Sequence, residues 1–185
     1  MIDANERIKY DTRNRNLLKT RNALLLKFLY LTAARRSEAA NLKWGDLQQD
    51  GEFQVVILQQ TKSGEPQKLK LRNELFEEIE CWNETLKTNQ IECEWVFPSL
   101  SFRTLGGKMS GKGVNDVVSK LGSAIGLKIS AHYLRHTAIT LALELGEPLQ
   151  KVQSYARHAS ANTTIRYFHD QQFLEKNPTD RLPMI

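Results

Sequence analysis

One helical turn of the stretch SAHYLRHTAIT, residues 130–140, carries three cationic or titratable side chains. His132, Arg135 and His136 stand at i, i+3 and i+4, so a helix makes them surface neighbours. Histidines at i and i+4 can share a zinc ion, but no glutamate follows His132 and Arg135 would repel a cation. A packed or surface cluster is the plain alternative. We favour an anion site, because the arginine fork matches phosphate oxygens and a histidine can exchange a proton.

If the anion is a phosphodiester under attack, the chemistry needs a nucleophile, several cations and a proton donor for the leaving oxygen. The chain offers four further candidates for these tasks: Arg35, Lys62, His158 and Tyr167. A tyrosine hydroxyl has an ordinary pKa near 10, so Tyr167 would need cations close by to favour its phenolate. We expect no metal and no other cofactor, and the positive charge would come from side chains.

The elements that must carry these residues follow from apolar spacing. A helix is predicted over 14–32, a short helix over 36–42, and a hairpin over 52–71 whose turn holds Lys62. Amphipathic helices are predicted over 73–87 and 111–126. The pattern is that of a mainly α fold with a small antiparallel β-sheet, in the α+β class.

Residues 130–140 belong to a predicted helix with an apolar stripe. The stripe is formed by Ala131, Leu134, Ala138, Leu141 and Leu145. Gly146 is expected to end this helix, and Pro148 to lie in the first turn of the next. A further helix follows the break at 158, with Ser160 as a plausible N-cap. We expect Trp44, Trp82 and Trp95 in the core.

Composition sets the broad class. The 185 residues are 41% hydrophobic and 25% charged, which fits one globular domain. No window approaches the roughly 18 apolar residues of a membrane span, and the polar start of the chain is no signal peptide. Cys81 and Cys93 are most simply free thiols of a reducing cytoplasm, which is where we expect the protein.

Charge is unevenly divided along the chain. Residues 1–45 carry 10 Lys and Arg against 4 Asp and Glu, and residues 101–170 carry 9 against 4. Residues 46–100 between them carry 5 against 11. Two basic blocks around an acidic one suit a polyanion such as nucleic acid, although uneven surface decoration gives the same counts.

Four segments, taken in order, resemble the catalytic domain of the tyrosine recombinases, the phage-integrase family. LTAARRSEAANLKWGDL is similar to that family's first-arginine segment, and TKSGEPQKLKL to its β-hairpin lysine segment. HYLRH is similar to its His-x-x-Arg box, and ARHASANTTIRYFH to the segment that joins the last histidine to the nucleophilic tyrosine. The resemblance covers residues 14–169 and implies the tyrosine recombinase catalytic-domain fold.

The resemblance implies a role for each candidate. Arg35 and Arg135 would clamp the non-bridging phosphate oxygens, and Lys62 would protonate the departing 5′ oxygen. Tyr167 would attack and carry a 3′-phosphotyrosyl link. The two histidines, His132 and His158, would assist the tyrosine's proton transfer and hydrogen-bond the phosphate respectively.

Neighbouring residues have supporting roles or depart from the family pattern. Glu38 is expected to orient Arg35 through a charge-assisted hydrogen bond, and His136 to be structural. Ala33 and Ala34 stand where the family usually has a glycine before its first arginine. Arg157 stands where the family usually has a glycine before the last histidine, which removes a tight backbone approach or adds a phosphate contact.

The resemblance implies a site-specific DNA recombinase or integrase of a mobile genetic element, which acts on double-stranded DNA without metal. The chain divides into a lead-in, 1–13, a catalytic core, 14–169, and a tail, 170–185, and the family's N-terminal core-binding domain is expected to be absent. We expect a monomer without DNA and a tetramer of protomers in synapsis, with no membrane partner. Alternatives are a non-catalytic DNA-binding remnant and type IB topoisomerase-like DNA relaxation.

Overall fold

The fold is described from a computed structural model that covers residues 2–8, 14–59, 65–158 and 163–164. Lys62, Ser160, Tyr167 and the tail 170–185 lie outside the described residues, so the expectations placed on them stay predictions. In chain order the helices are α1 (Ile2–Arg7), α2 (Arg15–Thr32), α3 (Arg36–Ala40), α4 (Asn73–Thr88), α5 (Gly111–Ser123), α6 (Ala131–Glu144) and α7 (Leu149–Ala156). Short 3₁₀ turns span Trp44–Asp46 and Phe102–Thr104.

The sheet is small and antiparallel, with strand order β1-β2-β3. Its strands are β1 (Leu47–Asp50), β2 (Phe53–Leu58) and β3 (Gln67–Lys70). The β2–β3 pairing confirms the predicted hairpin, with Leu58 opposite Gln67. The sequence did not predict β1, because its residues LQQD are polar and it forms an exposed edge.

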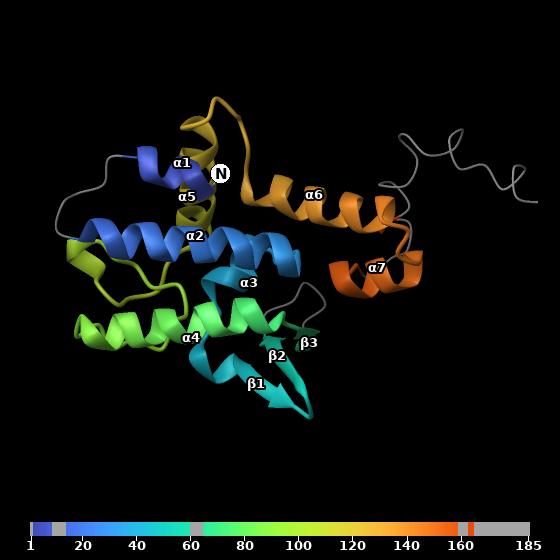
Figure 1. The fold of residues 1–185 in the computed structure, drawn as a ribbon, viewed down its shortest axis with the longest axis horizontal. Coiled ribbons are helices and arrows are strands. Elements are labelled where there is room, and N and C mark those ends of the chain that lie inside the picture. The colour runs from blue at the N-terminus through green and yellow to red at the C-terminus, as the bar shows by residue number, and fades with distance from the viewer. Residues whose placement is uncertain (1, 9–13, 60–64, 159–162, 165–185) are drawn as a thin grey trace, which may run out of the picture.

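Helix α2 is the centre of the fold, and α1, α3, α4 and α6 all pack against it (Figure 1). Of the apolar residues that predicted this helix, Leu18 is half-buried and the others are buried: Leu17, Leu24, Leu25, Phe28 and Leu29. Helix α4 presents Leu75, Ile79, Trp82 and Leu86 to the same interior. The fold is therefore mainly helical with a small antiparallel sheet, as predicted.

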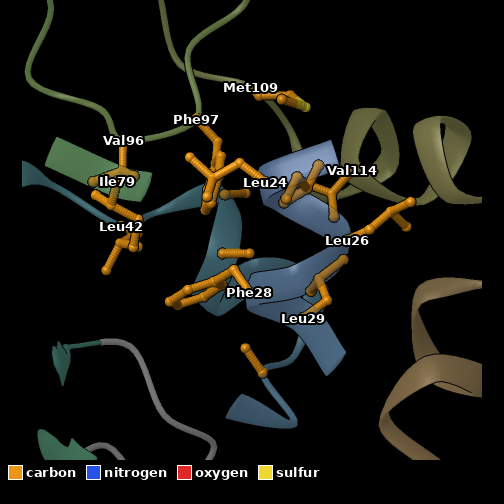
Figure 2. Packing of buried hydrophobic residues seen from close by; sticks show 14 of the residues in the cluster. Leu24, Leu26, Phe28, Leu29, Leu42, Ile79, Val96, Phe97, Met109 and Val114 are labelled. Carbon is orange, nitrogen blue, oxygen red and sulfur yellow. The ribbon is translucent and has the colours of Figure 1, made fainter. Parts of the chain in front are cut away.

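Two apolar clusters result. The larger, which we call the main core, includes Phe28, Phe97 and Trp82, and the rings of Phe28 and Phe97 lie 5.5 Å apart between centroids (Figure 2). The smaller, which we call the small core, joins the end of α2 to α6 and α7 through Ala33, Ala138, Ile139, Leu143, Val152 and Ala156. The small core fixes α6 and α7 beside the C-terminal end of α2.

The predicted stripe on α6 is right at its start and wrong at its end. Ala131, Leu134 and Ala138 are buried, but Leu141 is 37% and Leu145 76% exposed. The stripe followed a seven-residue repeat, which drifts by about 20° per heptad around a straight helix. The buried face continues instead through Ile139 and Leu143 of the small core.

The ends of α6 follow the sequence. The Ser130 hydroxyl accepts a hydrogen bond from the Tyr133 amide at 3.3 Å and caps the first turn. Gly146, at φ 84°, follows the last turn in the left-handed conformation that glycine favours. Pro148, which was expected in the first turn of α7, lies instead one residue earlier, as its N-cap.

Of the tryptophans, Trp82 lies in the core as expected, and its indole N–H donates to the Val96 carbonyl at 2.8 Å. Trp44 is half-buried and packs against the main core, but the expectation is wrong for Trp95, which is half-buried near the surface. The ammonium groups of Lys43 and Lys108 lie 4.8 and 5.2 Å from the centroid of the Trp95 ring, which therefore makes cation–π contacts at the surface. Among the described residues no helix is long and apolar enough to cross a bilayer.

Candidate active site

Arg35 stands at the start of α3, between the end of α2 and the first turn of the short helix. Its guanidinium donates to a Glu38 carboxylate oxygen at 2.6 Å, and its backbone N–H donates to the other oxygen at 2.7 Å. At the i, i+3 spacing the Glu38 carboxylate thus accepts from the first backbone N–H of the turn and also orients the Arg35 side chain. This confirms the predicted hydrogen bond between the two residues. The Arg35 side chain keeps 25% of its surface exposed.

Arg135 approaches the same place from α6. It is buried, and its two terminal nitrogens donate to the carbonyls of Ala33 and Ala156. Those carbonyls belong to the ends of α2 and α7, where the last helical C=O groups lack intrahelical partners and carry the negative end of the helix dipole. Arg35 is held in the same way, because one of its nitrogens donates to the Arg157 carbonyl at 3.0 Å.

These two arginines line one cavity of about 570 Å³. His132 also lines it, as do Ala34, Arg36, Ser37, Asn115, Ser130 and Ala131. The structure therefore brings three of the predicted site residues together, although they come from two distant segments of the chain. The sequence did not single out Ser37, Asn115 or Ser130, and the cap at Ser130 was the one signal that could have placed it near the site.

His132 and His136 form a pair on the exposed side of α6. Their Nε2 atoms lie 2.6 Å apart and their rings meet edge to face at 79°. Partial burial lowers the pKa of His136, and the charges of His132 and Arg135 lower it further. The neutral form of His136 is therefore favoured, and its ring contacts that of His132. Within the described residues no three His, Cys, Asp or Glu side chains gather as a metal ion would require.

His158 follows directly after α7. Its backbone N–H donates to the Gln153 carbonyl at 3.1 Å, and its Nδ1 lies 2.9 Å from the hydroxyl of Thr164. Burial lowers the pKa of His158 to about 4, with the charges of Arg135, Arg35 and Arg157 as the next causes. The imidazole is therefore neutral at pH 7 and can act as a hydrogen-bonding group.

Tyr155 and Tyr133 are the alternatives to Tyr167 as the nucleophile. Tyr155 donates its hydroxyl to the carbonyls of Tyr30 and Leu31, at 3.2 and 3.1 Å. Burial raises the pKa of Tyr155 to about 12, which makes its phenolate harder to form. Tyr133 is 57% exposed on α6. The roles of Tyr167 and Lys62 remain predictions, since both lie outside the described residues.

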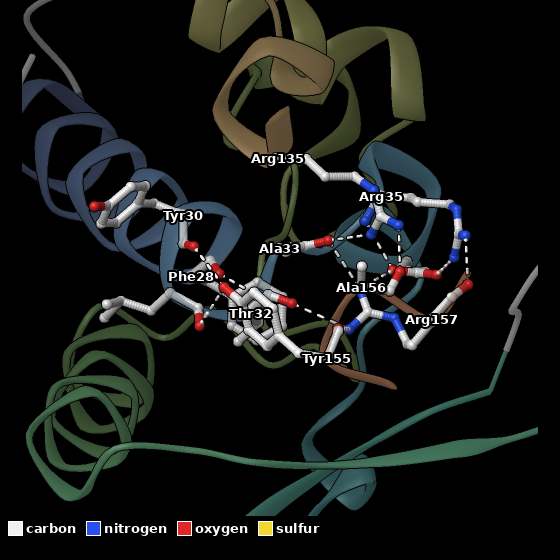
Figure 3. Close-up of polar contacts among 11 residues, drawn as sticks. Phe28, Tyr30, Thr32, Ala33, Arg35, Arg135, Tyr155, Ala156 and Arg157 are labelled. Carbon is white, nitrogen blue, oxygen red and sulfur yellow. Dashed lines mark hydrogen bonds and ion pairs between the residues drawn. The ribbon is translucent and has the colours of Figure 1, made fainter. Parts of the chain in front are cut away.

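The sequence did not predict how Arg157 is used. Its side chain is buried, and it contacts the end of α2 and Glu38 (Figure 3). The backbone at Arg157 is left-handed, at φ 55°, and the buried side chain does not favour the phosphate contact that was one of the two expectations for this position. We call the group formed by Arg35, Glu38, Arg135 and Arg157 the arginine junction.

Comparisons with known proteins agree with the resemblance. A model described as the phage integrase family matches residues 4–173. The tyrosine recombinase XerA of Pyrococcus horikoshii is 33% identical, over 80% of this chain and 50% of its own length. A tyrosine recombinase of Synechococcus elongatus is 31% identical, over 91% of this chain and 53% of its own. The chain thus spans about half the length of these curated relatives.

Solved structures give the fold. The XerH site-specific recombinase bound to its palindromic difH substrate, in a post-cleavage complex, matches with a TM-score of 0.75 at 24% identity, over 94% of this chain and 48% of that one. The XerA recombinase matches with a TM-score of 0.70 at 21% identity, over 96% and 65%. These matches confirm the fold that the resemblance implied.

Proposed function

Because this chain belongs to the phage integrase family, we propose that it is the catalytic domain of a site-specific DNA recombinase that cuts and rejoins strands through a 3′-phosphotyrosyl intermediate. The observation that carries the proposal is the convergence of Arg35 and Arg135 on one cavity that His132 also lines. A phosphodiester in this cavity would meet two guanidiniums whose positions are set by Glu38 and by backbone carbonyls.

The proposed reaction is a transesterification of a DNA phosphodiester. The Tyr167 oxygen attacks phosphorus, the bond to the 5′ oxygen breaks, and that oxygen takes a proton from Lys62. Arg35 and Arg135 stabilise the charge that develops on the non-bridging oxygens. The new ester keeps the energy of the broken bond, so the reverse attack by a 5′ hydroxyl rejoins a strand without ATP.

The histidines complete the proposal. His132, supported by His136, takes part in the proton transfer at Tyr167. His158 is neutral at physiological pH and hydrogen-bonds the phosphate without adding a full charge. In this arrangement the two arginines supply the fixed positive charge and the two histidines supply exchangeable protons.

Double-stranded DNA is the proposed partner, in the cytoplasm. The basic blocks 1–45 and 101–170 support this, and so do relatives solved with DNA, such as XerH with its difH substrate and a lambda integrase dimer on a core site. We further propose that the chain is a monomer without DNA and that protomers assemble into a tetramer on a recombination site. Light scattering with and without DNA tests this, and a stable tetramer without DNA would contradict it.

The test of the chemistry is a nicked suicide duplex, built on the sequence that the protein selects from random duplexes. We expect the protein to become covalently attached to the DNA, and Tyr167→Phe to abolish attachment while leaving binding intact. An adduct that survives Tyr167→Phe would contradict the assigned nucleophile. Binding without any adduct would point to a DNA-binding remnant, and relaxation of supercoils without strand exchange to a topoisomerase-like activity.

A further inference from the structure

Arg157 occupies a backbone position that is unfavourable for its type. It ends α7 in the left-handed conformation, at φ 55°, where a side chain is strained and glycine is favoured. Ala33, which ends α2, is also left-handed, at φ 46°. An arginine at such a position needs a compensating interaction of its side chain.

The hydrogen bonds of the Arg157 side chain provide this compensation, with acceptors in α3, in α7 and at the end of α2. One terminal nitrogen donates to the carbonyls of Thr32 and Tyr155, at 3.1 and 3.0 Å. The other donates to the Ala33 carbonyl at 2.8 Å and to a Glu38 oxygen at 3.0 Å. The side chain is 2% exposed, so it faces the interior in this arrangement and not the cavity that Arg35 and Arg135 line.

The charges of the arginine junction connect the contacts of Arg157 with the orientation of Arg35. Glu38 is buried and lies between two guanidiniums, with one carboxylate oxygen on Arg35 and the other on Arg157. Burial alone raises the pKa of Glu38, but the charge of Arg157 and the hydrogen bonds and charge of Arg35 outweigh it, so its pKa lies below the ordinary value. Two cations share one anion, so Arg35 is oriented by Glu38 without being neutralised by it.

Backbone carbonyls at the end of α7 also hold Arg35 and Arg135, the pair that we call the clamp. The Arg157 carbonyl accepts from Arg35, and the Ala156 carbonyl accepts from Arg135. The Arg157 side chain is hydrogen-bonded to the carbonyls of Thr32 and Ala33. It therefore fixes the carbonyls of Ala156 and Arg157 relative to the end of α2 (Figure 3).

We propose that Arg157 is a positioning residue for strand cleavage, which balances the charge of Glu38 and anchors the end of α7 so that Arg35 and Arg135 face the phosphate. The proposal rests on the proposed recombinase function. Arg157 does not touch the phosphate, so its loss should slow the chemical step far more than it weakens DNA binding.

The experiment compares variants on the nicked suicide duplex described above. Arg157→Met, which keeps the bulk and removes the donors, should slow adduct formation about 10- to 100-fold, since small misplacement of a clamp has effects of that order. DNA affinity should change less than about threefold, because no phosphate contact is lost. Lys87→Met, an exposed charge loss on α4 in the acidic block 46–100, is the control and should leave both unchanged.

Two further variants separate positioning from folding. Arg157→Gly relieves the left-handed strain and should still be slow, because the donors are gone. Adding Glu38→Gln to Arg157→Met removes the carboxylate that then neutralises Arg35, so it should recover part of the lost rate. Wild-type rates for Arg157→Gly, or a double variant no faster than Arg157→Met, would overturn the proposal.

A readout without DNA distinguishes this proposal from the proposed function. In a carbon-detected NMR titration of the Glu38 carboxyl, Arg157→Met should raise the pKa of Glu38, and Lys87→Met should not. If the wild-type chain forms no adduct, the recombinase function fails, and the Glu38 titration still decides the charge balance. An unchanged titration in Arg157→Met would reject the assigned role of Arg157.

Discussion

The main core is built from large apolar side chains, whereas the arginine junction a short distance away is built from charged side chains and helix-end carbonyls. In the main core Phe28 and Phe97 are almost completely buried (Figure 2), and so is Trp82. In the junction Arg135 and Arg157 are also buried, yet they contact polar atoms (Figure 3), and Glu38 is buried between polar partners. Apolar packing tolerates small adjustments, but a buried charge that loses its partner is strongly destabilising. The junction therefore fixes directions as well as positions.

The largest expected effect lies in the main core. Phe28→Ala should lower the free energy of unfolding by about 3–5 kcal/mol, because it removes a ring that packs on Phe97 and leaves a cavity. Urea unfolding followed by far-UV circular dichroism measures this. Leu145→Ala, at a 76% exposed position, is the control and should change it by less than about 0.5 kcal/mol. A loss under about 1 kcal/mol at Phe28 would contradict the packing described.

Substitutions in the arginine junction should change the rate of strand cleavage. Arg35→Ala and Arg135→Ala should each slow cleavage of the suicide duplex by roughly 100-fold or more, the effect of losing a transition-state donor. Arg36→Ala should slow it much less, because Arg36 lines the cavity without the contacts that orient Arg35. Equal losses at Arg35 and Arg36 would mean that the register of this segment is misread.

A smaller effect should appear as pH falls. The folded pKa of His158, about 4, lies below its ordinary value near 6.5, so the unfolded state binds the proton first. The stability that neutral His158 contributes is fully present above pH 6.5 and is lost as pH falls toward 4. His158→Gln should reduce this loss between pH 6.5 and 4, as measured by urea unfolding at each pH. An identical pH dependence in both proteins would show that His158 titrates normally.

The smallest effect is expected in the small core. Ile139→Val removes one buried methylene group between α2, α6 and α7 and should lower the free energy of unfolding by about 0.5–1.5 kcal/mol. Because the small core fixes the helices that bear Arg135 and Arg157, cleavage should fall measurably as well. Destabilisation with an unchanged cleavage rate would separate the small core from the junction.

Local patterns predicted the parts of the molecule that local interactions decide. The hydrogen bond between Arg35 and Glu38 and the stop at Gly146 were predicted, and each depends on residues within four positions. The edge strand β1 escaped prediction because its residues carry no apolar alternation. The position of Arg157 could not be predicted, since its partners Thr32 and Ala33 lie 125 and 124 residues away. No spacing rule links such residues, and only the packing of α7 on α2 brings them together.

The carbonyls at the ends of α2 and α7 have a consequence for ionic strength. The anchors of Arg135 are backbone dipoles buried with it, and dissolved ions screen buried contacts far less than surface charges. The proposed contacts between the basic blocks and DNA phosphates would be of the other kind, because such contacts weaken steeply as salt rises. Added salt should therefore release the DNA long before it disturbs the geometry of the clamp, so that chemistry on DNA already bound would be nearly independent of salt.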